Sequence, residues 1–105
     1  MRHMHETRQL RRLRRHLSIE NLWLYILSLI KRDECYAYTL PEQIEKEYGF
    51  KPSRVMVYIV LHMLEGEGLI KSEQKERRKY YTLTEKGKET LAEAKKEMGK
   101  LADRL

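Results

Sequence analysis

The amino-acid sequence predicts a mainly α fold with a small β-hairpin (α+β): a winged helix-turn-helix with an extra N-terminal helix and a C-terminal dimerisation helix. Three observations predict this fold. Two helical patterns meet across a very short turn at residues 49–52, a hairpin pattern follows at 69–83, and apolar residues recur at helical spacing through 84–105. We expect all 105 residues to form one domain, because chains of this length rarely divide into two cores. Its expected parts are a basic N-terminal arm and helix (1–17), a winged-helix core (18–83) and the C-terminal helix (84–105).

The N-terminal part combines basic and apolar residues. Three leucines stand at helical spacing in an Arg-rich segment, which predicts a basic amphipathic helix: Leu10, Leu13 and Leu17. Ser18 is expected to cap a second helix over residues 19–31. That helix is apolar nearly all round, so we expect a second copy of the chain to complete its burial, with Leu22 and Ile26 as partner contacts.

The helix-turn-helix pattern begins at Thr39 and Glu42, which have the spacing of a capping box. The helix they open is expected to end at Gly49, a residue suited to a left-handed C-cap. Only three residues then precede Ser53, which is expected to cap a helix over 53–67, the predicted recognition helix. Its expected inward stripe is Val57, Leu61 and Leu64.

A hairpin and a last helix follow. Leu69 and Ile70 are expected to begin one strand, residues 73–78 to form a charged turn, and residues 79–83 to return as a second strand. Thr84 is expected to cap the last helix. The apolar seam of that helix has coiled-coil spacing and supplies the other predicted dimer contacts: Leu91, Ala94, Met98, Leu101 and Leu105.

Positive charge is concentrated in two segments. The formal net charge is +6, and residues 1–17 contribute six Arg against one Glu. Residues 71–83 hold five basic and two acidic side chains, whereas residues 18–70 hold five basic and eight acidic ones. Such concentration points to a polyanion as the partner, and nucleic acid is the usual one.

The predicted DNA contacts come from the recognition helix and from the wing, which we define as residues 71–80. Ser53, Arg54 and the free backbone N–H groups beside them suit a DNA phosphate. Arg54 and His62 are expected to face the major groove, with Tyr58 at its edge. The wing is expected to contact flanking DNA through its basic residues, which are Lys71, Lys75, Arg77, Arg78 and Lys79.

Structural alternatives stay open at each of these positions. Ser53 can act only as a helix cap, Tyr58 only as a packing residue, and the charges of the wing only as a solvated turn. The arginines of the arm either contact phosphates or keep an interface helix soluble; they are Arg2, Arg8, Arg11, Arg12, Arg14 and Arg15.

The sequence carries no recognisable catalytic motif. It has no Gly-rich phosphate loop, nucleophile elbow or His-x-x-x-His pair, so neither enzyme activity nor a cofactor is expected. His3 and His5 do not form a recognisable structural metal site, and no metal is expected. The single cysteine, Cys35, is expected to be a partly buried apolar thiol in a cytoplasmic protein. The most apolar stretch, residues 22–30, is shorter than the roughly 20 residues that a bilayer requires, so no membrane span is expected.

Three motifs stand in the order and spacing of a known family. Tyr38 and Leu40 match its Gly-Tyr-x-Leu, although Ala37 replaces the glycine. The recognition helix matches the pattern Y-x-x-L-x-x-L-E-x-x-G-L through Tyr58, Leu61, Leu64, Glu65, Gly68 and Leu69. After the wing, RRKYYTLTEKGKETL (77–91) is similar to the family's rrkyYrlTekGreeL. Over residues 22–91 the chain therefore resembles the PadR-like transcriptional regulators, which are winged-helix repressors.

The resemblance implies a homodimer in which the C-terminal helix packs on the partner's N-terminal region. It also implies operator binding by two recognition helices with their flanking wings. A small aromatic effector, phenolic or multidrug in type, would bind at the dimer interface, where Trp23 is the candidate contact or is simply buried. Two features depart from the family: apolar Met56, Ile59 and Met63 on the exposed face of the recognition helix, which favour reading of DNA shape, and a single short C-terminal helix, which leaves little room for a drug cavity.

The sequence thus predicts a cytoplasmic, sequence-specific regulator of double-stranded DNA that acts as a homodimeric repressor. One alternative is an architectural protein that binds any duplex equally, as the basic arm suggests. The other is a winged-helix protein-interaction module, in which Met56, Ile59 and Met63 form the docking patch.

Overall fold

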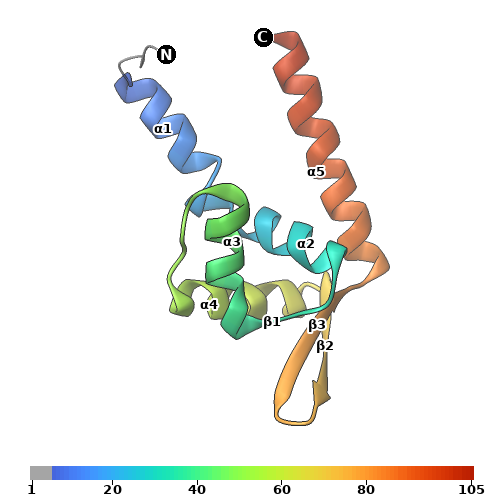
Figure 1. The fold of residues 1–105 in the computed structure, drawn as a ribbon. Helices are drawn as coiled ribbons and strands as arrows, with labels where there is room; N and C mark the ends of the chain where they lie inside the picture. The colour runs from blue at the N-terminus through green and yellow to red at the C-terminus, as the bar shows by residue number, and fades with distance from the viewer. Residues whose placement is uncertain (1–5) are drawn as a thin grey trace.

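The computed structural model describes residues 6–105 and confirms the predicted winged-helix architecture (Figure 1). Its elements are α1 (Arg8–His16), a 3-10 turn (Ile19–Asn21), α2 (Leu22–Arg32), β1 (Cys35–Tyr36), a second 3-10 turn (Ala37–Thr39), α3 (Leu40–Tyr48), α4 (Arg54–Gly66), β2 (Ile70–Lys75), β3 (Arg78–Leu83) and α5 (Glu85–Arg104). The predicted order of helices and hairpin is therefore observed, with one added strand.

The strands form a small antiparallel sheet in the order β1–β3–β2. β2 and β3 make the hairpin of the wing, with Lys75 opposite Arg78 at its end. The predicted charged turn over residues 73–78 is wrong, because the turn is only Glu76 and Arg77, and Glu76 takes a left-handed φ of 55°. Residues 73–79 are all exposed, and strands pair through backbone hydrogen bonds. Charged side chains can therefore belong to the strands at the hairpin tip, where no apolar residue is needed.

β1 is the strand that the sequence did not predict. Cys35 lies opposite Tyr81, and Tyr36 lies opposite Tyr80, whose ring centroid is 5.6 Å away. Cys35 is buried, as expected, and its thiol donates to the Asp33 carbonyl at 3.3 Å. Burial raises the pKa of the Cys35 thiol to about 11, so the thiol stays protonated.

The predicted caps of α4 and α5 are confirmed. Ser53 Oγ accepts a hydrogen bond from the Met56 N–H at 3.1 Å, and Thr84 Oγ1 accepts one from the Gly87 N–H at 3.0 Å. Each cap satisfies a backbone donor that the first helical turn leaves free. α3 ends at Gly49 with a φ of 84°, also as predicted.

Ser18 and Thr39 do not cap helices with their side chains. The Ser18 hydroxyl donates back to the Arg14 carbonyl at 2.7 Å, and a 3-10 turn separates it from α2. α3 begins beside Thr39, but the Thr39 hydroxyl donates to the Tyr36 carbonyl at 3.2 Å. In both cases a carbonyl of the preceding turn competes with the helix for the hydroxyl.

α2 lies at the centre of the core and packs against α3, α4, α5 and the sheet (Figure 1). The predicted partner contacts at Leu22 and Ile26 need correction, because these side chains are 2% and 0% exposed within the protomer. The chain's own helices and strands cover more of α2 than its pattern alone revealed. Other core residues include Leu27, Ile30, Leu40, Ile44, Val57, Leu61, Ile70, Tyr81 and Leu91.

α1 and α5 rise from the same side of the molecule, opposite the wing (Figure 1). The radius of gyration is 15.3 Å, against roughly 13 Å for a compact chain of about this length. Large apolar side chains on both helices and at their C-terminal caps are exposed: Leu13, Leu17, Met98, Leu101 and Leu105. The two helices therefore carry apolar stripes that the described part of the protomer does not cover.

The start of α5 is hydrogen-bonded to the segment that follows the recognition helix α4. The Thr84 hydroxyl donates to the Gly68 carbonyl at 2.6 Å, and the Thr84 N–H donates to the Leu69 carbonyl at 3.1 Å. One turn later, a Cβ added to Gly87 would lie 2.0 Å from the Leu69 carbonyl oxygen. Only glycine therefore fits at this crossing of α5 over the chain that leads into the wing.

Gly87→Ala should lower the free energy of unfolding by at least about 1–3 kcal/mol, because two backbones must separate to admit one methyl group. Gly99→Ala is the matched control in the same helix, since nothing lies within 4 Å of that position. It should raise the free energy of unfolding by up to about 1 kcal/mol through helix propensity. Urea denaturation of both variants measures the difference, and equal stabilities would contradict the close approach.

Candidate nucleic-acid interface

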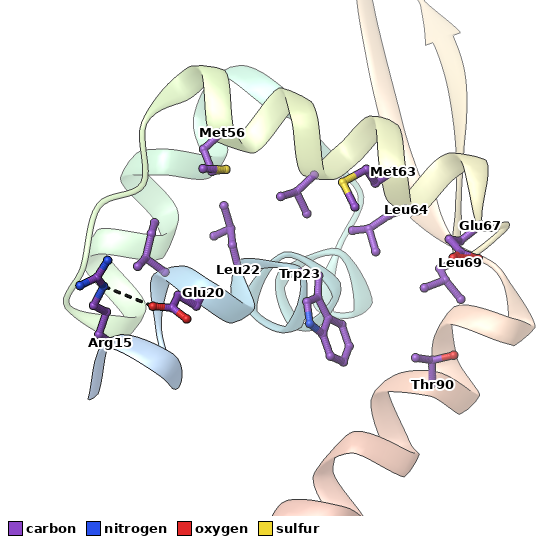
Figure 2. Close-up of a pocket in the computed structure, with 12 residues that line it drawn as sticks. Arg15, Glu20, Leu22, Trp23, Met56, Met63, Leu64, Glu67, Leu69 and Thr90 are labelled. Carbon is purple, nitrogen blue, oxygen red and sulfur yellow. Dashed lines mark ion pairs between the residues drawn. The ribbon is translucent and has the colours of Figure 1, made fainter. Parts of the chain in front are cut away.

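The recognition helix α4 presents two different exposed regions. Its inward stripe is the predicted one: Val57, Leu61 and Leu64. Of the three apolar residues expected on its exposed face, Met56 and Met63 line a hollow beside α2 (Figure 2). Ile59 does not line that hollow and stays exposed, as do Tyr58 and His62. Two of the three residues of the predicted apolar patch therefore line this hollow, and the third does not.

Arg54, predicted to face the major groove, is engaged within the protomer. Its guanidinium donates to the Tyr38 carbonyl at 2.5 Å and to Glu42 at 3.2 Å. It also lies 4.1 Å from the centroid of the Tyr38 ring. Arg54 thus ties the start of α4 to the 3-10 turn and to α3, and Ser53 beside it serves as the cap.

The wing cations differ in how far their charge is already paired. Lys75 Nζ lies 2.8 and 2.9 Å from the two carboxylate oxygens of Glu34, a hydrogen-bonded pairing that raises the pKa of Lys75. Arg77 and Arg78 form no ion pair within residues 6–105; the guanidinium of Arg78 lies 4.6 Å from the Tyr36 ring centroid. Within residues 6–105, Arg77 and Arg78 at the tip and Lys71 at the base are therefore the wing cations without an ion pair.

A polar contact holds the wing against the recognition helix. The Ser72 hydroxyl of β2 donates to Glu65 Oε2 of α4 at 2.6 Å, where both residues are partly buried. Lys79 Nζ of β3 lies 3.8 Å from the other carboxylate oxygen of Glu65. Lys71, at the base of β2, is exposed opposite Thr82. Glu65 therefore connects both strands of the wing to α4.

A hollow of about 450 Å³ separates the recognition helix from the wing. Aromatic and basic side chains line it: Tyr36, Ala37, Tyr38, Tyr58, Arg77, Arg78, Lys79 and Tyr81. Tyr58 and the three cations are among the predicted DNA contacts, whereas Tyr36 and Tyr38 were not predicted to contact DNA. The sequence signal for these contacts was the closely spaced pair Tyr36 and Tyr38, together with Tyr58 on the recognition helix. The fold brings these segments together.

A second hollow, of about 660 Å³, lies on the other side of α4 (Figure 2). Trp23, Met56, Val60, Met63 and Leu69 give it a largely apolar lining. Arg15 and Glu20 form an ion pair of 3.2 Å at one end, and Thr90 of α5 lies at the other (Figure 2). The Trp23 Nε1–H donates to Asn21 at 3.2 Å, so the indole is oriented at this hollow.

Helix α1, which carries the arginines of the arm except Arg2, lies away from the wing (Figure 1). Arg11 and Arg14 pair with Glu6, and Arg15 pairs with Glu20. Arg8 and Arg12 form no ion pair with any residue from 6 to 105. Arg2, His3 and His5 fall outside the described residues.

Two features are absent from residues 6–105, a cluster of metal-ligating side chains and a membrane-spanning helix. Within this range no three His, Cys, Asp or Glu side chains gather as a metal site requires. Across the same residues, no helix has both the length and the apolar character needed to span a bilayer.

The segment from α2 into α5 matches a known family. The model for the transcriptional regulator PadR-like family matches residues 26–93. The chain belongs to this family. The match confirms the resemblance seen in the sequence motifs, and the family is one of transcriptional regulators rather than enzymes.

Solved structures of PadR proteins share the fold of this PadR-like chain. A PadR family transcription regulator from hypervirulent Clostridium difficile R20291 is 30% identical with a TM-score of 0.71, over 77% of this chain and 90% of that one. A PadR family regulator from Eggerthella lenta DSM 2243 is 28% identical with a TM-score of 0.73, over 90% of this chain and 83% of that one. Bacillus subtilis PadR, solved in complex with operator DNA, is 28% identical with a TM-score of 0.63, over 72% of this chain and 47% of that one. Among curated proteins no match was found.

Proposed function

We propose that this PadR-like chain is a sequence-specific regulator of double-stranded DNA, acting as a homodimeric repressor in the cytoplasm, with no enzyme activity and no cofactor. The recognition helix α4 enters the major groove and the wing contacts flanking DNA. One observation carries the proposal: the exposed Tyr58 of α4 and the unpaired Arg77 and Arg78 of the wing border a single hollow. The operator complex of the related Bacillus subtilis protein supports it.

The proposed contacts keep the predicted set but divide it by role: Ser53, Arg54, Tyr58, His62, Lys71, Lys75, Arg77, Arg78 and Lys79. Arg77, Arg78 and Lys71 supply the unpaired positive charge, because Lys75 is paired with Glu34 and Lys79 with Glu65. Ser53 and Arg54 hold the start of α4, whose free backbone N–H groups suit a phosphate.

Fluorescence anisotropy near physiological salt tests this function. The probe is a labelled duplex from upstream of the protein's own gene, and a shuffled duplex of the same composition is the competitor. Tight binding that resists the competitor is the expected result. Binding abolished by the competitor would favour the architectural alternative, and binding to neither duplex would favour the protein-interaction alternative.

Arg77→Ala combined with Arg78→Ala should weaken binding to both duplexes and flatten the salt dependence. Each lost phosphate contact removes about 0.9 from the slope of log K against log salt, so the slope should fall by about 2. The control is Lys96→Gln with Lys100→Gln, which removes two positive charges from exposed positions on α5 outside the proposed DNA contacts and should leave the slope nearly unchanged. Equal slopes for the two double variants would remove the arginines from the interface.

We also propose that residues 1–105 act as one domain whose dimer forms through α1 and α5. The apolar stripes on these helices support this, since they rise from the same side and stay exposed in the protomer (Figure 1). Leu101 and Leu105 are 61% and 98% exposed, whereas Leu91 is buried in the protomer and Ala94 is half-buried. The outer half of α5 thus offers the larger free surface.

Met98→Gln with Leu101→Gln should shift the dimer toward monomer, because glutamine keeps helix propensity but removes apolar area from the proposed seam. Lys96→Gln with Lys100→Gln is the control, since both lysines are exposed on the same stretch of α5 outside the stripe. Sedimentation equilibrium measures the dissociation constant of each. A seam variant as dimeric as the control would place the interface elsewhere.

A second proposal is that the hollow beside Trp23 binds a small aromatic effector. Its volume of about 660 Å³ lies within the range of ligand sites, roughly 300–1,000 Å³. Its lining combines Trp23 with two adaptable methionines, Met56 and Met63, which belong to the recognition helix. A ligand bound in this hollow would contact the recognition helix α4 directly. The alternative for Trp23 is burial against a partner subunit.

Trp23 is the only tryptophan, so its fluorescence reports on this hollow without labelling. Titration with the neutral phenol 1-naphthol should quench it saturably. Met56→Gln with Met63→Gln should weaken that binding, whereas Ile59→Gln, outside the hollow on the same helix, should not. Linear, non-saturating quenching, or equal affinity in both variants, would contradict an effector site.

A further inference from the structure

The hollow between the recognition helix and the wing is unusually rich in tyrosine. Four of the seven tyrosines in the chain line it, although they come from three separate elements and the turn after β1: Tyr36, Tyr38, Tyr58 and Tyr81. Tyr38 and Tyr58 are 60% and 50% exposed. A tyrosine presents an apolar ring and one uncharged hydrogen-bond donor, so this surface differs in kind from the arginines at its rim.

The tyrosine hydroxyls in this hollow are free, in contrast to those of Tyr25 and Tyr48. Tyr25 donates to the Leu17 carbonyl, and Tyr48 donates to Ser28 Oγ at 3.0 Å. In the part of the chain that the structure describes, the hydroxyls of Tyr36, Tyr38 and Tyr58 have no hydrogen-bond partner within the protein. They are open to solvent and available to an external acceptor.

Two of these rings are held in position by stacked cations. The Arg54 guanidinium lies 4.1 Å from the Tyr38 centroid, and that of Arg78 lies 4.6 Å from the Tyr36 centroid. Arg54 is itself fixed by the Tyr38 carbonyl and by Glu42. Donors ordered before binding lose less conformational entropy when they meet a ligand. The free hydroxyls of Tyr36 and Tyr38 are therefore positioned before a ligand binds.

We infer that this hollow receives one sugar-phosphate strand of the duplex, and that the hydroxyls of Tyr36, Tyr38 and Tyr58 donate to its phosphate oxygens. The inference rests on the proposed function. A helix in the major groove and a wing on the adjacent minor groove lie on opposite sides of one backbone strand, so that strand passes between them. Tyrosine is a common donor to phosphate, and such contacts fix the register of the protein without reading sequence.

The tyrosines and the wing arginines then contribute to DNA affinity through different interactions. Arg77 and Arg78 attract the duplex by displacing counterions, an effect that depends steeply on salt. The tyrosine hydroxyls carry no charge, so they release no counterions and add an affinity that is nearly independent of salt. Together they would orient the duplex between α4 and the wing.

The test uses Tyr36→Phe, Tyr38→Phe and Tyr58→Phe, singly and combined, in the full-length protein. Each change removes one hydroxyl and keeps the ring, so packing and the stacked cations remain. Tyr80→Phe is the matched control, because Tyr80 lies next to Tyr81 in β3 but does not line the hollow. Anisotropy over a salt series is measured with the upstream duplex and with the shuffled one.

Each hollow variant should raise Kd roughly tenfold on both duplexes, in line with the loss of one hydrogen bond to a charged acceptor. The salt slope should stay at the wild-type value, and Tyr80→Phe should leave Kd unchanged. A combined variant that binds both duplexes as tightly as wild type would overturn the inference while leaving the proposed function intact. A loss confined to one duplex would also overturn it, since the hydroxyls would then read bases. Wild-type protein that binds neither duplex would instead remove the proposed function itself.

Discussion

Burial of α2 is the interaction on which the rest of the structure depends. Ile26 and Leu27 have no exposed surface, and full burial of each such side chain contributes about 1.5–3 kcal/mol. Because α2 is apolar on nearly every side, it contacts α3, α4, α5 and the sheet at once. The recognition helix, the wing and the C-terminal helix therefore share one rigid support, and α1, which contributes no buried residue, projects free of it.

The polar contacts around this core orient the wing more than they stabilise the fold. The pair between Lys75 and Glu34 and the pair between Lys79 and Glu65 lie at the surface, where solvent screens the attraction, so they add little stability. Their effect is to fix the hairpin against its neighbours while Arg77 and Arg78 keep their charge for a partner. The protein thus separates the cations that shape the wing from those at its tip.

The close approach at Gly87 connects the helix proposed to form the dimer with the part of the chain proposed to bind DNA. It joins α5, whose outer half carries the free apolar stripe, to Leu69, which leads from α4 into the wing. A dimer that forms through α5 would therefore set the distance and angle between two recognition helices through a short, stiff connection. In dimeric helix-turn-helix proteins that spacing must match the spacing of the DNA half-sites.

The sequence by itself determined the order and limits of most elements, because those depend on local signals. Ser53 and Thr84 cap their helices through bonds to residues three positions away, and Gly49 ends α3 through a backbone angle that glycine adopts readily. The inward stripe of α4 follows from helical periodicity, and the basic wing follows from composition.

Tertiary structure alone decided which side chains are free to contact a partner. Whether Leu22 is covered, whether Lys75 meets Glu34 across 41 positions of chain, and whether Tyr36 faces Tyr58 across a hollow depend on contacts between distant segments. Local spacing carries no record of such contacts, because they arise only when the packed core fixes those segments side by side.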